Sequence, residues 1–475
     1  MKISHYLLAG LAIFGLAACS SDDDISGGEN PGIETGTYMS VSFTDPSYPA
    51  ASRTEGLEGD NSDNGIENVS IVLAKNYQIV KTVSAPVKTN ANGQFQSAPI
   101  EVSVGSYQVF AFVNPSDGVL TYIQQTGVPV RGVIDLAEKT AETYAKSGSF
   151  AMMSQNNKVG GHGEFYVTIT TDNTIGNPAP VTDTPNGTVK KSIPVQRFVA
   201  KLKNTTETIN IDGVKDIKDN NGDPLFKSAT ISGFVEINGI KKSNTIQDWK
   251  EYTGVASPEG KLLSIPAVTS GVEFYNQLDD IQAEAMKGNL PTFKAGPIHV
   301  LENRPDEAQM GNTTGVIFSA KFELNKDATS FYYLEGLLNG QPYAAYFTNL
   351  DELKLKYKEV TGEDWDDELL NDPNLAKENG LSIYNGNVAY YTYWVDDMNY
   401  KVEVDNGVNK VLERYPVVHR NTIYNLTVKN IFNVGPSIPG GPDPIDPTDP
   451  IKKPTYMEVD ISVQPWIISN NDIDL

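Results

Sequence analysis

The sequence of 475 residues contains a single cysteine, Cys19, and only four histidines. One thiol excludes a disulfide framework within the chain and a zinc site built from clustered cysteines. Basic residues are also scarce, because 37 lysines and arginines stand against 60 aspartates and glutamates, for a formal net charge of −23. Such a surface repels phosphate backbones, so nucleic acid is not an expected partner.

Sequence patterns of common enzyme chemistry are missing as well. No Gly-x-Ser-x-Gly, Walker A or His-Glu-x-x-His pattern occurs. Residues 219–223 lack the twelfth-position glutamate of a calcium loop and are interpreted as a turn. His162, His299 and His419 have no neighbours that indicate catalysis, and the acidic residues around Trp365 fit a solvated face. We therefore predict no enzyme activity, no metal and no cofactor; carboxylate pairs for sugar hydrolysis stay open because they can be distant in sequence.

What the chain does contain is typical of a sheet protein. Hydrophobic residues make up 39% of the sequence, and 23 tyrosines accompany many valines, isoleucines and threonines. Branched and aromatic side chains fit a pleated, half-buried surface. The length is suited to two or three domains.

Residues 1–18 have the pattern of a secretion signal that ends in a lipobox. Lys2 supplies the positive start, and the apolar run from Leu7 to Ala18 is too short to span a bilayer comfortably. The run ends Leu-Ala-Ala-Cys, which places Cys19 where a diacylglycerol would be attached. The alternative is an ordinary secretory signal followed by a free cysteine. No later segment has 18 consecutive apolar residues.

A Ser-Ser-Asp-Asp-Asp run, residues 20–24, follows the cysteine directly. This acidic run resembles the surface-export signal of lipoproteins in the Bacteroidetes. The alternative is a solvated tether, which continues into the Gly-rich segment 26–36.

The first strong strand pattern has three apolar residues, Met39, Val41 and Phe43, that alternate with serines. A polar, Gly-rich stretch with Arg53 follows and is expected to be an exposed loop. Further strands are predicted over 69–74, 78–83, 100–104, 107–113, 150–153, 165–171, 194–203, 228–237, 316–324, 387–395 and 421–428. Helices are predicted over 135–146, 271–287 and 349–359, and a turn at Asn92-Gly93. This pattern predicts two antiparallel β-sandwiches with short helical insertions.

The carboxy-terminal stretch combines a Pro-rich arm with one more strand. Seven prolines between residues 435 and 454 favour extended polyproline II, which at about 3.1 Å per residue would reach roughly 60 Å. The strand that follows presents four apolar residues on one face and is followed by Trp466; the four are Met457, Val459, Ile461 and Val463.

Both ends of the chain therefore have an alternating strand tethered by a segment of low structure. A cut at Arg53 would remove the first strand and leave an apolar groove with unpaired edges. The last strand of a neighbouring copy could fill this groove by β-augmentation. Four or five buried apolar side chains would contribute roughly 6–15 kcal/mol as an upper estimate, and a head-to-tail contact that does not close gives a filament. The alternative is that both ends complete their own domain.

These motifs in their order resemble the fimbrillins of the Bacteroidales type V pili, closest to the branch of minor-fimbria major subunits. The matching segments are 16–19, 38–43 with Arg53, 150–154, 197–202, 415–421 with Tyr424, and 461–466. The insertions 271–287 and 343–381 have no counterpart that can be placed.

The resemblance implies a lipoprotein precursor that is exported to the cell surface and cut by an Arg- or Lys-specific protease. The cut falls after Arg53 and makes Thr54 the first residue, so the lipid and the first strand are lost. The implied all-β fold has two tandem transthyretin-like sandwiches, a Pro-rich arm and a donor strand. The bounds are 1–18 for the signal, 19–53 for the tether and removable strand, 54–190 and 191–435 for the sandwiches, and 436–475 for the arm and donor strand.

The expected partners are other fimbrial subunits, copies of the same chain, the protease, and host or bacterial surface ligands. The outer membrane is a partner through the lipid until cleavage, and the mature location is the fimbria. An arginine at the cut and a complete arm favour a stalk subunit, with tip and anchor subunits as alternatives. A different class of protein, a glycan-binding surface lipoprotein of a nutrient-uptake system, would use exposed aromatic residues such as Tyr390 to Trp394, although their alternation fits a core strand better.

Overall fold

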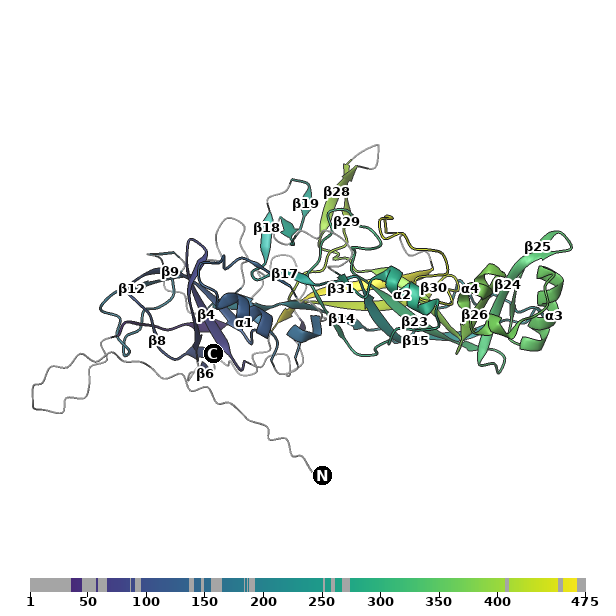
Figure 1. The fold of residues 1–475 in the computed structure, drawn as a ribbon, viewed down its shortest axis with the longest axis horizontal. Coiled ribbons are helices and arrows are strands. Elements are labelled where there is room, and N and C mark those ends of the chain that lie inside the picture. The colour runs from purple at the N-terminus through teal and green to yellow at the C-terminus, as the bar shows by residue number, and fades with distance from the viewer. Residues whose placement is uncertain are drawn as a thin grey trace, which may run out of the picture. The chain divides into compact units, whose positions relative to one another are not determined.

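The computed structural model describes most of the chain between Gly36 and Ile467 (Figure 1). The described residues are 36–44, 57–58, 66–85, 87–89, 95–135, 141–146, 149–154, 165–182, 184–185, 187, 193–250, 253–257, 261–266, 274–405, 410–451 and 456–467. Several predictions fall outside these ranges, namely the signal 1–18, the lipidation residue Cys19, the cleavage pair Arg53 and Thr54, and the Asn92-Gly93 turn. No helix in the described part of the chain is long and apolar enough to cross a membrane.

The amino-terminal part is built around a nine-stranded sheet in the order β5-β4-β9-β11-β13-β2-β7-β6, with β12 paired to β9. Its strands are β2 (Ser42–Thr44), β4 (Val69–Lys75), β5 (Gln78–Ala85), β6 (Val87–Thr89), β7 (Phe95–Ser97), β9 (Gly105–Val113), β11 (Met152–Ser154), β12 (Tyr166–Ile169) and β13 (Ile193–Arg197). A separate antiparallel ladder joins β1 (Tyr38–Met39) to β8 (Ile100–Glu101). Neighbouring strands are antiparallel except for the pair of β13 and β2.

Local sequence explains the hairpin of β4 and β5, which confirms two predicted strands. Asn76 and Tyr77 both have positive φ, at 49° and 60°, as a two-residue turn that matches the twist of the flanking strands requires. The first six residues of β4 are all buried. The helix α1 (Asp117–Ile123), which the sequence analysis did not predict, buries Val119 and Ile123 in the same hydrophobic core as this hairpin.

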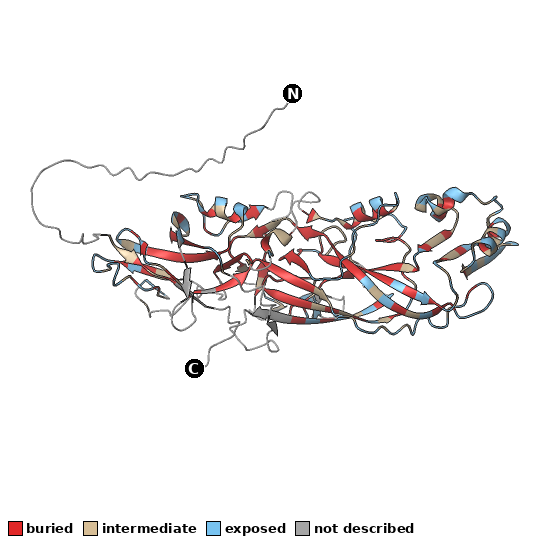
Figure 2. Cartoon of the chain, turned by 90° about the horizontal axis from the view of Figure 1, so that it is seen from below, coloured by how far each residue is buried: buried red, intermediate tan, exposed pale blue. Residues whose placement is uncertain are grey.

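The carboxy-terminal part contains two sheets that share one hydrophobic core. The first has the order β22-β14-β30-β31-β3, and the second is β15-β23-β27. Their strands are β3 (Leu57–Glu58), β14 (Val199–Asn204), β15 (Phe226–Ile237), β22 (Ile298–Leu301), β23 (Gly315–Leu324), β27 (Val388–Trp394), β30 (Thr422–Ile431) and β31 (Met457–Ile467). Phe234 and Phe318 of the second sheet pack in one core with Tyr424 and Leu426 of the first. Figure 2 shows the buried residues concentrated along these strands.

An insertion between β23 and β27 has a small core of its own. It consists of the sheet β25-β24-β26 together with two helices and a 3₁₀ turn. The elements are β24 (Ser330–Leu338), β25 (Gln341–Phe347), α3 (Leu350–Thr361), η4 (Asp367–Leu370), α4 (Pro373–Glu378) and β26 (Leu381–Asn385). The predicted helix 349–359 is confirmed as α3, because the Asn349 side chain accepts hydrogen bonds from the first turn and Gly362 ends the helix at φ 81°.

The remaining elements are short, and two predicted helices are shorter than expected. The 3₁₀ turn η2 (Ala141–Tyr144) is the helical segment described within 135–146, and α2 (Leu278–Ala285) is the one within 271–287. The short strands are β10 (Val133–Asp135), β16 (Gly239–Ile240), β17 (Lys242–Asn244), β18 (Asp248–Lys250), β19 (Val255–Ala256), β20 (Leu262–Ser264), β21 (Phe274–Tyr275), β28 (Lys401–Asp405) and β29 (Lys410–Arg414).

The fold therefore confirms the predicted all-β class of antiparallel sheets with few helices. The chain passes from the amino-terminal sheet to the carboxy-terminal one between β13 and β14, so the change falls a few residues after the predicted boundary at 190. The transthyretin-like pairing and the domain bounds remain predictions.

A fully buried ion pair lies where the two cores meet. Arg420 Nη2 donates to Glu302 Oε1, and both side chains are 0% exposed. Gln247 donates to the second carboxylate oxygen at 3.0 Å, and the guanidinium of Arg420 lies 5.3 Å from the ring centroid of Phe198. A buried charge without its partner is strongly destabilising, so the two residues depend on each other.

We expect Arg420→Met to lower the free energy of unfolding by about 3–5 kcal/mol, because it leaves the Glu302 carboxylate buried without its cation. Urea unfolding followed by circular dichroism measures this change. Lys227→Met serves as the matched control, because its ion pair with Glu323 is solvent-exposed and contributes little. Equal effects of the two substitutions would contradict the assignment of the buried pair.

Candidate assembly site

The first strand of the chain is hydrogen-bonded along both of its edges. On one edge β1 pairs antiparallel with β8, where Met39 lies opposite Ile100. On the other edge the N–H of Tyr38 donates to the carbonyl of Asn173 at 2.8 Å, and the N–H of Ala179 donates to the carbonyl of Tyr38 at 2.8 Å. This segment is therefore an interior strand.

The continuation of this strand, β2, is also enclosed. Phe43 lies opposite Phe95 of the antiparallel β7 and opposite Ile193 of the parallel β13. Among the predicted apolar residues, Met39 is 0% and Val41 is 1% exposed, while only the backbone of Phe43 is described. Removal of residues 38–44 would thus open a slot, bounded by β7 and β8 on one side and by β13 with residues 173–179 on the other.

The last strand, β31, occupies a different kind of position. It pairs antiparallel with β30 from Met457, opposite Ile431, to Pro465, opposite Thr422. On its other edge, the pairs found among the described residues are Trp466 with Leu57 and Ile467 with Glu58. In the described part of the chain, the edge from 457 to 464 has no strand partner, so β31 is largely an edge strand.

The side chains of β31 alternate as the sequence predicts. Met457, Ile461 and Val463 are 3%, 7% and 3% exposed and lie in the carboxy-terminal core, and the half-buried Val459 packs against it. The side chain of Trp466 is not among those described. In the single chain, the predicted donor strand thus completes its own sandwich, as the alternative interpretation of the chain ends expects. We call this position against β30 the seat.

The Pro-rich arm differs from the extended spacer that the sequence predicts. Residues 436–451 turn at Gly440 and Gly441, which have φ of 81° and 87°. Several carbonyl groups of this segment accept hydrogen bonds from other parts of the chain. Both amide hydrogens of Gln282 are donated at 2.6 Å to the carbonyls of Gly441 and Asp443. The prediction of full extension is wrong for these residues, because partners distant in sequence hold the carbonyls that polyproline II leaves to solvent. No local sequence signal marks Gln282.

We expect Val463→Asp to weaken the attachment of β31 to its seat, because the substitution places a charge in the core. The expected loss is about 3 kcal/mol or more, seen as faster amide hydrogen exchange in β30 and β31. Ser462→Asp is the control, since Ser462 is the exposed neighbour on the opposite face. Similar exchange in both variants would show that burial of alternate residues does not hold the strand.

Two of the histidines noted in the sequence have structural partners. His419 Nδ1 lies 3.0 Å from Asp397 Oδ2, and both side chains are buried. His299 Nδ1 lies 2.9 Å from Glu142 Oε2; His162 is outside the described residues. No group of three metal-ligating side chains occurs in the described part of the chain.

The carboxylates of residues 219–223, the turn with partial likeness to a calcium loop, bind a lysine side chain. Lys326 Nζ lies 2.5 Å from Asp219 Oδ2 and 2.9 Å from Asp223 Oδ2. Burial acts to raise the pKa of Asp219, but the hydrogen bonds from Lys326 and from backbone N–H groups outweigh it, and the net pKa is lowered. The ammonium group of Lys326 supplies the positive charge that these carboxylates require.

A buried carboxyl group on β15 has a strongly perturbed pKa. Glu236 is 4% exposed, and burial raises its pKa to about 8, with Glu142 acting in the same direction. The hydrogen bond with Tyr275 and the charge of Lys294 act in the opposite direction but do not offset the burial. Glu236 is therefore mainly neutral at pH 7.

This pKa predicts how stability depends on pH. Between the ordinary pKa of 4.5 and the folded value of about 8, the unfolded chain releases the Glu236 proton while the folded chain keeps it. The free energy of unfolding should thus decrease as pH rises through this window, by up to about 1.4 kcal/mol per pH unit from this group. Glu236→Gln should remove this part of the decrease in urea unfolding at pH 5 to 8. An unchanged slope in the variant would refute the assignment.

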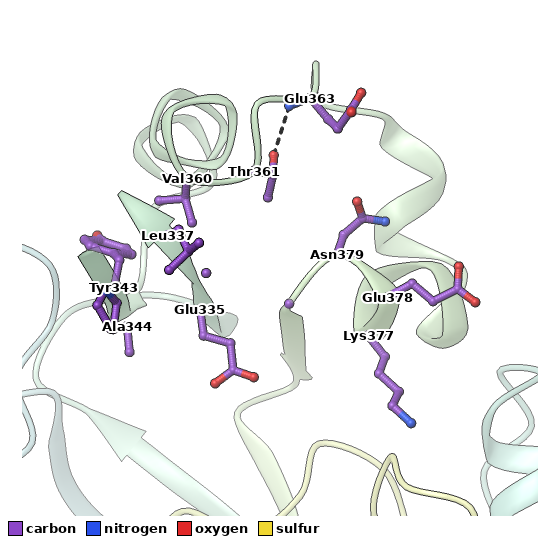
Figure 3. Close-up of a pocket in the computed structure, with 13 residues that line it drawn as sticks. Glu335, Leu337, Tyr343, Ala344, Val360, Thr361, Glu363, Lys377, Glu378 and Asn379 are labelled. Carbon is purple, nitrogen blue, oxygen red and sulfur yellow. Dashed lines mark hydrogen bonds between the residues drawn. The ribbon is translucent and has the colours of Figure 1, made fainter. Parts of the chain in front are cut away.

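The structure also places the aromatic residues that a glycan-binding protein would need. Tyr390, Tyr391, Tyr393 and Trp394 are 6%, 3%, 8% and 7% exposed, so β27 is a core strand and offers no exposed platform. An open surface pocket of about 800 Å³ lies in the insertion, between β24, β25, α3 and α4 (Figure 3). Among the described residues that line it, Tyr343 is the one aromatic, and none comes from β1, β2 or β31.

The antiparallel sheets and few helices define an all-β protein, and parts of its sequence are similar to known fimbrial subunits. Residues 382–472 match the family model described as "Major fimbrial subunit protein type IV, Fimbrillin, C-terminal". The Minor fimbrium subunit Mfa1 of Porphyromonas gingivalis is 23% identical, with 100% of both chains covered. These two matches confirm the resemblance to fimbrillins that the sequence motifs predicted.

Two solved structures also align with most of this chain at low sequence identity. A putative cell adhesion protein from Parabacteroides distasonis is 15% identical, with 91% of this chain and 100% of that chain covered at a TM-score of 0.45. A fimbrilin (FimA) from Porphyromonas gingivalis is 13% identical, with 92% and 100% covered at a TM-score of 0.43.

Proposed function

We propose that this protein is a structural subunit of a cell-surface fimbria, polymerised by strand exchange between copies. In this proposal a protease cuts after Arg53, the segment with β1 and β2 leaves its slot, and β31 of a neighbouring copy enters. The observation that carries the proposal is the enclosed position of the first strand. Met39 and Val41 are buried and backbone groups are paired on both edges, so only another extended apolar segment can replace it.

The energetics of the exchange depend mainly on backbone pairing. The moving strand buries alternate apolar side chains both in its own seat and in the slot of the neighbour, so its apolar burial changes little. In the seat it pairs along one edge, whereas the slot offers two. Each additional hydrogen bond contributes about 0.5–1.5 kcal/mol net, which favours the slot.

The precursor stage of the proposal depends on the amino-terminal sequence. Lipid on Cys19 would hold the chain at the outer membrane during export, and cleavage before Thr54 would free it for assembly. The arginine and the complete last strand favour a stalk subunit over a tip or anchor subunit. Its partners are then other fimbrial subunits and copies of itself, with adhesion to surface ligands as the purpose and no enzymatic reaction.

Trypsin treatment of the purified full chain should produce a species that begins at Thr54 and then assembles. We expect ladders that resist mild denaturant in gel electrophoresis, and mass spectrometry gives the new amino terminus. Arg53→Ala should stay monomeric under the same treatment, because its slot stays filled. A cut chain that remains monomeric and folded would refute polymerisation by strand exchange.

A disulfide across the seat tests the donor strand separately. Asn425 and Ser462 are opposite each other in the β30–β31 ladder, so cysteines at both positions should lock β31 in its own chain. The oxidised, trimmed double variant should remain monomeric and should assemble after reduction. The single variant Ser462→Cys is the control and should assemble in both conditions. Assembly of the locked chain would show that β31 is not the donor.

A further inference from the structure

The two terminal strands resemble each other in sequence, and not only in the alternation of apolar and polar residues. Residues 37–44 read Thr-Tyr-Met-Ser-Val-Ser-Phe-Thr, and residues 455–462 read Thr-Tyr-Met-Glu-Val-Asp-Ile-Ser. Four of the eight positions are identical, and two more keep their character, with Ile461 for Phe43 and Ser462 for Thr44. The remaining two differ only on the face turned away from the apolar residues.

The matched residues also have matched environments. Met39 is 0% and Met457 is 3% exposed, so each methionine lies in the core beneath its own strand. The adjacent tyrosines point the other way, with Tyr38 half-buried and Tyr456 48% exposed. The carboxy-terminal strand thus presents the side chains of the first strand in the same order and on the same face.

We propose that residues 455–462 of one copy replace residues 37–44 of the next one residue for residue, in the same direction and register. This inference rests on the proposed strand exchange and specifies its geometry. Met457 takes the place of Met39, Val459 that of Val41, and Ile461 that of Phe43. In this arrangement β31 runs antiparallel to β7 and β8 and parallel to β13.

Side-chain volume disfavours a shift by two residues and the reversed register that begins with Val463. A shift by two residues puts Val459 at the position of Met39 and Ile461 at that of Val41. Reversal of direction puts Val463 at the position of Met39 and again Ile461 at that of Val41. Either arrangement leaves a void at the methionine site and overfills the valine site, and both defects destabilise a packed core. The proposed register keeps methionine and valine in place.

A polar contact at the start of the slot supports the same register. The hydroxyl of Thr37 donates to the carbonyl of Val102, and the N–H of Val102 donates to the carbonyl of Thr37 at 2.8 Å. Thr455 brings an identical hydroxyl to this position in the proposed register. A shifted or reversed strand would place a residue other than threonine there.

Intermolecular disulfides test the register directly. Tyr38 lies opposite Glu101, and Ser42 lies opposite Gln96, so Tyr456 and Asp460 of the donor should take these places. Residues opposite each other in a ladder have Cα atoms about 4.5–5.5 Å apart, which suits a disulfide. Each substitution is made in a separate chain, and trimming removes the natural Cys19. Mixed, trimmed and oxidised filaments should give covalent dimers for Glu101→Cys with Tyr456→Cys and for Gln96→Cys with Asp460→Cys.

Cysteine pairs chosen for the shifted and reversed registers serve as the comparison. A two-residue shift predicts dimers of Gln96→Cys with Ser462→Cys, and reversal predicts dimers of Glu101→Cys with Gln464→Cys. Filaments that give only these dimers overturn the register but keep strand exchange. Trimmed chains that stay monomeric and give no dimer with any pair overturn the strand exchange, and the register with it.

Discussion

The structure depends on one constraint, the hydrogen bonding of the first strand along both of its edges. An edge strand can leave and expose one row of backbone groups to water. The segment with β1 and β2 has partners on both sides and places Met39 and Val41 in the core. Its removal would leave two unpaired rows above an apolar floor, and buried groups of this kind require partners. The protein therefore needs an extended segment in this position.

One hydrogen-bonded corner links the slot to the seat. Arg197 ends β13, which forms one side of the slot, and both its N–H and its guanidinium donate to Asn421 Oδ1, at 3.2 and 3.4 Å. Asn421 immediately precedes β30, which forms the seat, and Arg420 before it makes the buried ion pair with Glu302. Strand β13 beside the slot and strand β30 of the seat thus meet at the same buried polar group, so a shift of either strand would disturb shared hydrogen bonds.

Local sequence was sufficient to predict the elements whose pattern repeats over many residues. Strands such as β4, β9 and β27 follow from short runs rich in branched and aromatic residues. Helix α3 follows from its helical pattern, with caps at Asn349 and Gly362. The hairpin of β24 and β25 was missed although Asn339-Gly340 carries the turn signal, with φ of 54° and 77°. The docking of the arm could not be predicted, because Gln282 and its carbonyl partners are about 160 residues apart. The partner of β31 was equally hidden, since an alternating strand fits any apolar surface with a free edge.

In the proposed strand exchange, the two positions of β31 would differ by a small free energy, and side-chain fit would then decide between them. The seat is intramolecular, and a short linker gives a millimolar effective concentration; against micromolar subunits this advantage is about 4 kcal/mol. The second edge of the slot offers a few hydrogen bonds, among them those of Tyr38 with Asn173 and Ala179, and at about 0.5–1.5 kcal/mol each they offset that advantage without a wide margin. A donor strand that leaves a void or overfills the slot would bind there less stably than in the seat, because one misplaced methylene is worth about 1 kcal/mol. Residues 455–459 repeat the Thr-Tyr-Met-x-Val order of residues 37–41. In the proposed exchange, this repeat would avoid the loss of packing free energy.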